Sequence, residues 1–347
     1  MQISKKINVK KSNIIPIKTI LILLFFFTFL ISFTMGRYSV SLKDLFYIFY
    51  AKIVGLPQTW FESVDTVLFK IRLPRIIAAL LIGSSLSVAG ATYQGLFKNP
   101  MVSSDILGAS AGAGFGAAMA LLLSFNIAGV QFFAFVFGIG AVLLTYTISK
   151  VIGHSNSTTL ILVLTGMVVS SLFQSLISLT KYVADPDSKL PAITFWLMGG
   201  LSTITFKEIY ILLIPFIIGI VPILLLRWKL NVLSFGEEEA KSLGIDTDKM
   251  RIILIVCSSL LTASSVSVAG IIGWVGLVIP HVTRLIVGPN YKTLIPSSIL
   301  IGSTYLLLID DISRTIFSME IPLGILTSLI GAPFFISILL KGRKSLI

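Results

Sequence analysis

The chain has 347 residues, of which 55% are hydrophobic and only 12% are charged. Soluble domains carry about 25% charged residues, so this composition excludes a soluble enzyme, and the hydrophobic content excludes a disordered chain. The net charge of +12 fits lysines at the cytoplasmic ends of membrane helices, and no basic stripe with interleaved aromatic residues indicates nucleic-acid binding. The single cysteine, Cys257, and two histidines, His154 and His281, argue against a disulfide framework and a metal site.

A membrane-spanning helix needs about 20 apolar residues. Stretches of this kind lie at residues 16–35, 74–97, 105–125, 129–151, 159–182, 208–228, 250–270, 271–287, 294–310 and 323–340. The pattern predicts an all-α, polytopic membrane protein with about ten transmembrane helices, in a single domain over residues 1–347. The first stretch is expected to remain as an anchor, because it is too long for a signal peptide and no small-residue cleavage site follows it.

Lysine and arginine are more frequent in the segments that face the cytoplasm when the N-terminus is placed inside. Both termini are therefore expected in the cytoplasm. Three connecting segments are more than simple turns. Residues 36–73 form an outer segment with an amphipathic stretch at 42–50, residues 191–201 are expected as a short outer helix, and residues 231–249 form an inner segment.

Residues 80–108 resemble residues 260–288 at a constant offset of 180. The matching serines are Ser84, Ser85 and Ser87 in the first copy and Ser264, Ser265 and Ser267 in the second. The two copies would cross the membrane in opposite directions. An inverted internal repeat of this kind is typical of transporters. The serines either hydrogen-bond between helices or line a wet passage, and helix packing is the favoured interpretation.

Gly108, Gly112 and Gly116 recur at four-residue spacing, which in lipid allows two helix backbones to approach closely. The same region fits a loose dinucleotide fingerprint, but it lacks the preceding strand, so packing is favoured. Asp310 and Asp311 are acidic residues near the outer end of an apolar stretch. We expect a local ion pair with Arg314, which lies one helical turn away, instead of a proton relay.

The chain contains no Gly-Lys pair and therefore no Walker A loop, so any ATP must be bound by another chain. Residues 237–243 read as a short helix between Gly236 and Gly244, with acidic residues at its N-terminal end. This helix is a candidate docking element for an ATPase. A solvated loop without a special role is the alternative.

Several sequence blocks together resemble the FecCD-type permease subunits of ABC importers for iron-siderophores, haem and cobalamin. The blocks are residues 72–75, 90–100, 107–112, 195–200, 273–284 and 321–334, and the resemblance spans about residues 20–341. It implies a multi-pass protein of the cell membrane that works with a second permease subunit, identical or related, two cytoplasmic ABC ATPases and an extracytoplasmic binding protein. No cofactor, metal or enzymatic activity of its own is implied, since a separate subunit hydrolyses ATP.

The resemblance implies import of an iron-siderophore-type chelate by alternating access. Cobalamin, haem or a metal oxyanion remain alternative cargoes. An ion-coupled secondary transporter, or a membrane receptor or scaffold without transport, are alternatives from other classes.

The resemblance also assigns roles to residues. Binding-protein docking falls to Arg72, Arg75 and Arg314, with interfacial snorkelling as the alternative for the first two. The cytoplasmic gate is expected at Asn99, Pro100 and Met101, together with Thr158 and Thr159. Coupling to the ATPase is assigned to Gly236, Glu237, Glu238, Glu239, Ala240, Leu243 and Gly244. His281 is expected to cap or pack, and His154 to be solvated.

Overall fold

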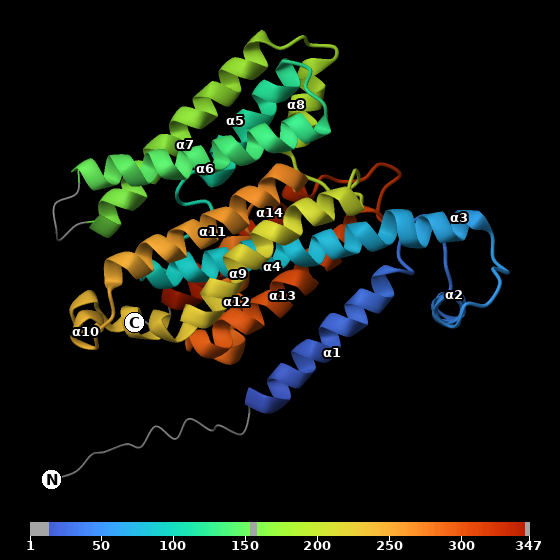
Figure 1. Cartoon of the computed structure of the whole chain (residues 1–347), viewed down its shortest axis with the longest axis horizontal. Helices are drawn as coiled ribbons and strands as arrows, with labels where there is room; N and C mark the ends of the chain where they lie inside the picture. The colour runs from blue at the N-terminus through green and yellow to red at the C-terminus, as the bar shows by residue number, and fades with distance from the viewer. Residues whose placement is uncertain (1–13, 153–157, 344–347) are drawn as a thin grey trace.

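The computed structural model describes residues 14–152 and 158–343, which form helices and connections without a β-strand. Figure 1 shows the long helices packed side by side, with α2 (Leu42–Val54) lying across them. Their bounds are α1 Ile14–Ser32, α2 Leu42–Val54, α3 Glu62–Asp65, α4 Leu73–Leu96, α5 Ala109–Leu122, α6 Ile127–Ile152, α7 Thr158–Val183, α8 Lys189–Leu197, α9 Phe206–Phe235, α10 Glu237–Ser242, α11 Thr247–Ala269, α12 Val275–Val287, α13 Tyr291–Ser313 and α14 Leu323–Arg343. A π-helix, Thr66–Arg72, joins α3 to α4.

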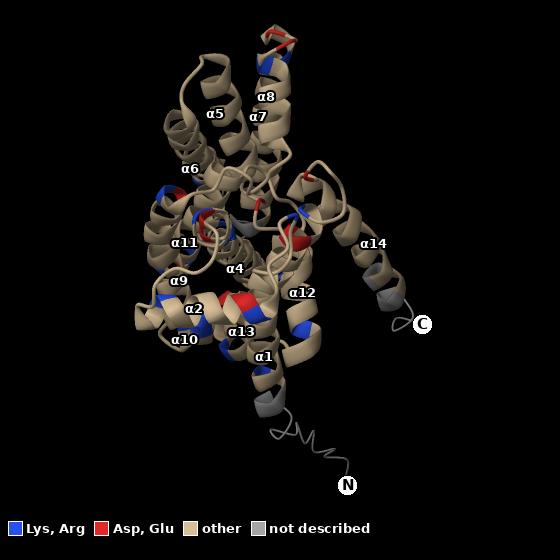
Figure 2. Ribbon diagram, turned by 90° about the vertical axis from the view of Figure 1, so that its right-hand side faces the viewer, with Lys and Arg blue, Asp and Glu red and all other residues tan. Residues whose placement is uncertain are grey.

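Among the described residues, six helices are long and apolar enough to cross a membrane: α4 with its extension from Glu62, α6, α7, α9, α11 and α13. Shorter apolar helices are α1, α5, α12 and α14. These helices coincide with the ten predicted stretches, and most of the ribbon carries no charge (Figure 2). The prediction of an all-α, multi-pass membrane protein is confirmed.

The largest differences from the predicted stretches are at the starts of α5 and α12 and at the end of α9. α5 starts at Ala109 instead of residue 105, and α12 starts at Val275 instead of residue 271, because the residues before each have no regular secondary structure. Gly108 (φ +85°) and Gly270 (φ +69°) adopt left-handed backbone conformations there, which glycine allows without steric cost. α9 continues to Phe235 through two internal prolines, which neighbouring helices make tolerable in membranes.

The inverted repeat is present at the level of whole helices. α4 and α11 run in opposite directions (Figure 1), and each is followed by a non-helical stretch, a short helix and two further helices. The residue register that the sequence suggested is wrong. Gly90 lies within α4 while Gly270 ends α11, and Pro100 lies in a turn while Pro280 lies inside α12. Similar apolar composition therefore misled the residue-by-residue alignment.

Glycines bring α4 into backbone contact with α12 and α13. A Cβ atom on Gly90 would lie 1.8 Å from the carbonyl oxygen of Gly276, and one on Gly83 would lie 2.3 Å from that of Gly302. The predicted close packing after Gly108 is confirmed as well. Cβ atoms on Gly112 and Gly116 would lie 2.4 and 2.3 Å from carbonyl oxygens of α6. Small residues thus set the spacing of the central helices.

The repeated serines are buried in these contacts. The hydroxyl of Ser84 donates to the carbonyl oxygen of Leu81 at 2.8 Å, and Ser265 donates to that of Leu261 at 2.7 Å. Such bonds lie within one helix, so these serines pack instead of linking helices.

The two ends of the bundle differ, and we refer to them as the α10 end and the α2 end. α1 begins, and α4 and α14 finish, on the side of α10 (Figure 1). The connection between α1 and α4, which contains α2, and the connection between α13 and α14 lie on the opposite side.

We expect that Gly90→Val will unfold the protein at a lower temperature than the native chain. The added side chain meets the backbone of α12, which cannot yield, and overpacking of this kind costs about 1–3 kcal/mol. Thermal unfolding of the detergent-solubilised protein measures the effect. Gly140→Val on α6 is the matched control, since nothing lies within 4 Å of a Cβ atom at that position. Equal unfolding temperatures for the two variants would contradict the packing argument.

Candidate functional site

The three arginines assigned to binding-protein docking lie together at the α2 end. Arg72 ends the π-helix, Arg75 lies in the first turn of α4, and Arg314 follows α13. All three are buried, with 4, 5 and 6% of their surface exposed. Docking or snorkelling at the membrane interface would expose Arg72 and Arg75, whereas the structure buries both side chains inside the protein.

Arg75 connects three segments of the chain. Its Nε atom lies 2.9 Å from both carboxylate oxygens of Asp310 on α13, and its Nη1 atom lies 2.9 Å from Glu320 in the connection between α13 and α14. The Asp310 side chain is completely buried, while 37% of the Glu320 side chain is exposed. Arg75 therefore fixes the start of α4 to α13 and to this connection.

Arg314 and Arg72 attach α1 to the same region. Arg314 forms an ion pair with Asp311 and donates to the carbonyl oxygen of Ser32 at 2.7 Å, and the Ser32 hydroxyl donates to Asp311 at 2.6 Å. The predicted pair of Asp311 with Arg314 is confirmed. Arg72 donates to the carbonyl oxygens of Phe33 and Tyr38, the second at 2.5 Å.

These side chains form a charge cluster that we define as Arg72, Arg75, Arg314, Asp310, Asp311 and Glu320. Three positive charges meet three negative ones, so the cluster presents no net positive surface. Asp310 and Glu320 were not predicted as partners of Arg75. Two adjacent acids near the end of an apolar helix were the available signal, because an acid at membrane depth needs a cationic partner.

A cavity of about 380 Å³ lies beside the charge cluster. Arg75 and Glu320 form part of its wall, and Gln131 of α6 and Trp196 of α8 line it from the other side. The cavity thus separates the helices α5, α6 and α8 from α4 and α13 at the α2 end. Because Glu320 is held by Arg75, the ion pair also fixes one wall of this cavity.

At the opposite end, the predicted short helix is confirmed as α10, bounded by Gly236 and Gly244 with φ of +154° and +75°. Ala240 is completely buried, and Glu237 forms an ion pair with Arg251 at the start of α11. Leu243 just after the helix is 70% exposed. α10 is therefore fixed on one side, and it presents a second, mixed surface with Glu238, Glu239 and Lys241.

The segment assigned to the cytoplasmic gate is a tight turn after α4, on the same side of the molecule as α10. Asn99 donates its backbone N–H to Gln94 at 3.2 Å, and its side-chain oxygen accepts from Met101 at 2.9 Å. Asn99, Pro100 and Met101 are exposed. α7 begins at Thr158, but the side chains of Thr158 and Thr159, like the whole of His154, lie outside the described residues.

Gln94 is a buried polar residue that the sequence analysis did not single out. Its side-chain nitrogen donates to the carbonyl oxygens of Val102 at 3.2 Å and Leu277 at 3.3 Å, and its oxygen accepts from Arg284 at 3.2 Å. Gln94 thereby ties the turn after α4 to α12. A glutamine near the end of an apolar helix was the signal for it. His281, also on α12, belongs to no group of three metal ligands among the described residues.

A polar stripe on α7 was also missed. Ser171, Gln174, Ser175 and Ser178 are exposed, and their spacing of three or four residues places them on one face of the helix. Only 28% of the apolar window of α7 is buried. A polar face on a spanning helix is unfavourable against hydrocarbon, so this face requires water or another protein surface. The helical spacing of these residues in the sequence would have revealed it.

An apolar bundle with an inverted repeat and a polar face on a spanning helix defines a multi-pass membrane protein of the transporter class. Residues 22–341 match the FecCD transport family. The chain therefore belongs to this family and is a permease subunit of an ABC importer in the cell membrane.

Relatives agree with this assignment. The molybdate import system permease MolB of Haemophilus influenzae is 40% identical over 91% of this chain and 92% of its own length. A protein of Helicobacter pylori named as a probable iron chelatin transport system permease is 43% identical over 81% of this chain and 85% of its own. A solved structure of an ABC transporter assigned to the metal-chelate type, in an inward-facing conformation, superposes with a TM-score of 0.84 at 39% identity, covering 94% of this chain and 99% of that one.

We expect Arg75→Gln to destabilise the isolated permease, without any binding protein present. The substitution takes the 2.8 Å ion pair from buried Asp310 and leaves it only the longer 3.7 Å contact with Arg314, and breaking a buried pair costs about 3–5 kcal/mol. Thermal unfolding in detergent measures the loss. Arg37→Gln is the control, because Arg37 is exposed and makes one long hydrogen bond of 3.4 Å to Phe317. If both variants unfold like the native chain, the cluster does not stabilise the fold.

Proposed function

We propose that this permease moves an iron-siderophore-type chelate from a docked binding protein into the cytoplasm. Two ABC ATPases drive the cycle, and a second permease subunit completes the passage. The observation that supports the ATP-driven cycle best is α10: a short helix fixed to α9 and α11 on one side and exposed on the other. Membership in an importer family and the iron chelatin relative support the cargo.

In this proposal the α10 end faces the cytoplasm. Lysines and arginines gather there, on α9, α10 and the starts of α11 and α13, and cytoplasmic segments of membrane proteins are enriched in these residues. Both described termini of the bundle, the start of α1 and the end of α14, then also lie on the cytoplasmic side. The turn at 99–101 faces the same compartment, which supports its role in a cytoplasmic gate.

The exposed surface of α10 is the proposed ATPase contact. Leu243 offers an exposed apolar side chain, and Glu238 and Glu239 offer charges beside it. The fixed side of α10 would transmit a movement of the ATPase to α11 through Glu237 and Arg251. Gly236 supports the geometry, since its φ of +154° is a backbone conformation that residues other than glycine rarely adopt.

The polar stripe of α7 is the proposed lining of the passage. If a second permease subunit faces it, the two polar stripes enclose a wet path between the subunits. Hydroxyl groups that already donate to their own helix, such as Ser171 to Met167 at 3.0 Å, would bind a passing chelate only weakly. Weak contact suits conduction, because a tight site would retain the cargo.

We keep the proposal that Arg72, Arg75 and Arg314 take part in docking. Because all three are buried and paired, docking would have to act on existing ion pairs. Arg75 is the member whose partner, Glu320, is partly exposed. A carboxylate of the binding protein would have to replace Glu320 on Arg75, so docking exchanges one ion pair for another. The free energy of such an exchange is small, which suits a partner that must also leave.

Molybdate is a second candidate cargo, because the molybdate permease MolB matches this chain over 91% of its length. Reconstitution of the permease with its ATPase and binding protein in liposomes distinguishes the two. We expect ATP-dependent uptake of a radioactive iron-siderophore chelate and none of molybdate. Uptake of molybdate alone would replace the proposed cargo. Uptake that survives without ATP and stops with an ionophore would instead indicate an ion-coupled transporter.

We expect Leu243→Asp to uncouple the permease from its ATPase. Burying a leucine is worth about 1.5–3 kcal/mol, so loss of this contact should weaken ATPase association roughly 10- to 100-fold. The measurement is co-purification of the ATPase together with transport. Gln58→Asp adds the same charge at an exposed position of the α2 end and should leave association unchanged. Normal association of the Leu243→Asp variant would exclude this surface as the ATPase contact.

A further inference from the structure

α2 has two apolar faces, and the fold uses only one of them. Leu45, Ile48 and Ala51 are 0, 1 and 0% exposed and face the protein. They belong to the hydrophobic core that also contains Phe33 at the end of α1 and Leu68 of the π-helix. This face attaches α2 to the bundle.

The second face is an exposed stripe of Leu42, Phe46, Tyr50 and Ile53. Intervals of four, four and three residues place these side chains along one side of the helix. They are 50, 57, 60 and 84% exposed. A stripe of this width on the surface of a protein marks a contact with a partner or a membrane.

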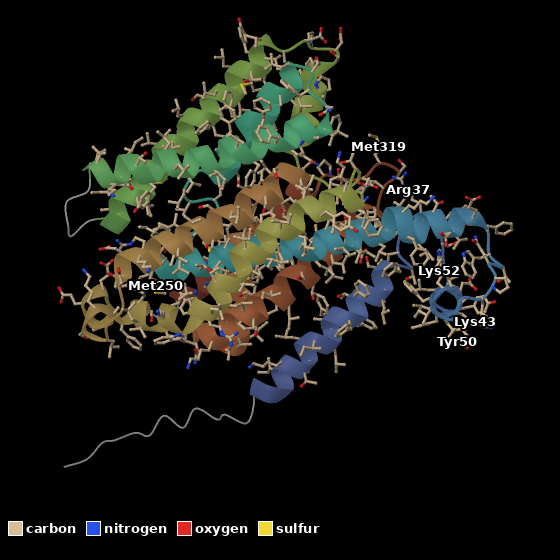
Figure 3. The ribbon with its side chains drawn as sticks, in the orientation of Figure 1. Arg37, Lys43, Tyr50, Lys52, Met250 and Met319 are labelled. Carbon is tan, nitrogen blue, oxygen red and sulfur yellow. The ribbon has the colours of Figure 1, made fainter. Side chains whose placement is uncertain are left out.

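α2 lies across the bundle. Figure 1 shows it end-on beside the horizontal spans, and Figure 2, turned by 90°, shows it lengthwise. If the spans follow the membrane normal, α2 lies parallel to the membrane plane. In Figure 3, Tyr50 and Lys43 point away from the bundle while Lys52 points back toward it. Lys52 forms an ion pair with Asp65 at 2.6 Å and lies 4.2 Å above the Phe69 ring.

The position of α2 along the bundle indicates what covers the stripe. α2 follows α1, whose outward side chains Ile20, Leu23 and Phe27 are 61, 63 and 61% exposed and, on a membrane helix, face lipid. The stripe begins ten residues after Ser32, the last residue of α1, and Figure 1 shows α2 beyond that end of α1. If α1 crosses the acyl-chain region, a helix at this level lies at the boundary between the acyl chains and the headgroups.

The side chains around the stripe suit that depth. Tyr47 and Trp60 contact each other with ring centroids 6.2 Å apart, and Phe61 beside them is 81% exposed. Tyrosine and tryptophan concentrate at membrane interfaces, where their rings meet acyl chains and their polar atoms meet headgroups. Lys43 on the flank of the stripe would face the lipid phosphates.

We infer that α2 is an in-plane membrane anchor whose stripe of Leu42, Phe46, Tyr50 and Ile53 inserts into the bilayer interface at the α2 end. The anchor sets the depth of the adjoining segments. It holds α3 through the ion pair of Lys52 with Asp65, and it lies directly after Tyr38, whose carbonyl oxygen accepts from Arg72. This inference is independent of the cargo.

Depth-dependent fluorescence quenching tests the anchor. Cys257→Ser removes the single native cysteine, and Tyr50→Cys or Asp44→Cys then carries an environment-sensitive dye. Asp44 is exposed and lies on the side of α2 opposite Phe46, so it is the matched control on the same helix. Each full-length, labelled permease is reconstituted in phosphatidylcholine vesicles that contain a spin label near the headgroup or at the methyl end of the acyl chain.

Interfacial helices insert about 5–10 Å, so the shallow label should quench the Tyr50→Cys dye roughly threefold more than the deep label does. The Asp44→Cys dye should show little quenching by either label. Absence of lipid quenching at position 50, or equal quenching at both positions, would overturn the inference. An Ile53→Cys variant that forms disulfide-linked dimers in vesicles would overturn it in favour of a second permease copy. If the binding protein, and not the lipid, blocks chemical labelling of the cysteine at position 53, the stripe is a docking surface for the binding protein and the inference is overturned.

Discussion

The backbone contacts of α4 with α12 and α13 are the constraint from which much of the architecture follows. In lipid, apolar side chains gain little by moving from acyl chains to a helix surface, so close van der Waals contact must hold the helices together. The glycine pairs Gly83 with Gly302 and Gly90 with Gly276 allow that contact. α12 therefore begins beside the second half of α4, inside the bundle, and the non-helical residues 270–274 precede it. Irregular backbone at this depth is tolerated only where protein surrounds it.

The same packing explains why the charge cluster can exist. Arg75 lies eight residues before Gly83 on α4, and Asp310 lies eight residues after Gly302 on α13. Because the two helices run in opposite directions through the glycine contact, both residues reach the same level and meet at 2.8 Å. The arginines that the family resemblance assigned to docking are thus partners of internal carboxylates first. Any docking partner competes with Asp310 and Glu320 for them.

Hydropathy located the spanning helices well, because such a helix can be recognised from a local run of apolar residues. The signal for the short helix between Gly236 and Gly244 was also local, because it lay in the flanking glycines and the acidic first turn. Its structure as α10 agrees with the prediction. The starts of α5 and α12 were missed because residues 105–108 and 271–274 adjoin long apolar stretches, and only tertiary contacts show that these residues are not helical. One such contact is the bond of Thr262 to the carbonyl oxygen of Ser104 at 3.2 Å. The partners of Arg75 were missed for a related reason: Asp310 lies 235 residues away in the chain.

α9 and α11 connect the two ends of the molecule, and this connection gives the proposed cycle a physical route. Both helices adjoin α10, and Arg251 at the start of α11 binds Glu237. At the other end, Val268 and Ala269 of α11 line the cavity next to Arg75 and Glu320. Continuous helices transmit displacement along their axes, because every turn is held by backbone hydrogen bonds. A shift of α10 would therefore change the cavity wall beside the charge cluster. The pair of buried Arg75 with partly exposed Glu320 is the point where an ATPase movement and a docked binding protein would act on the same residues.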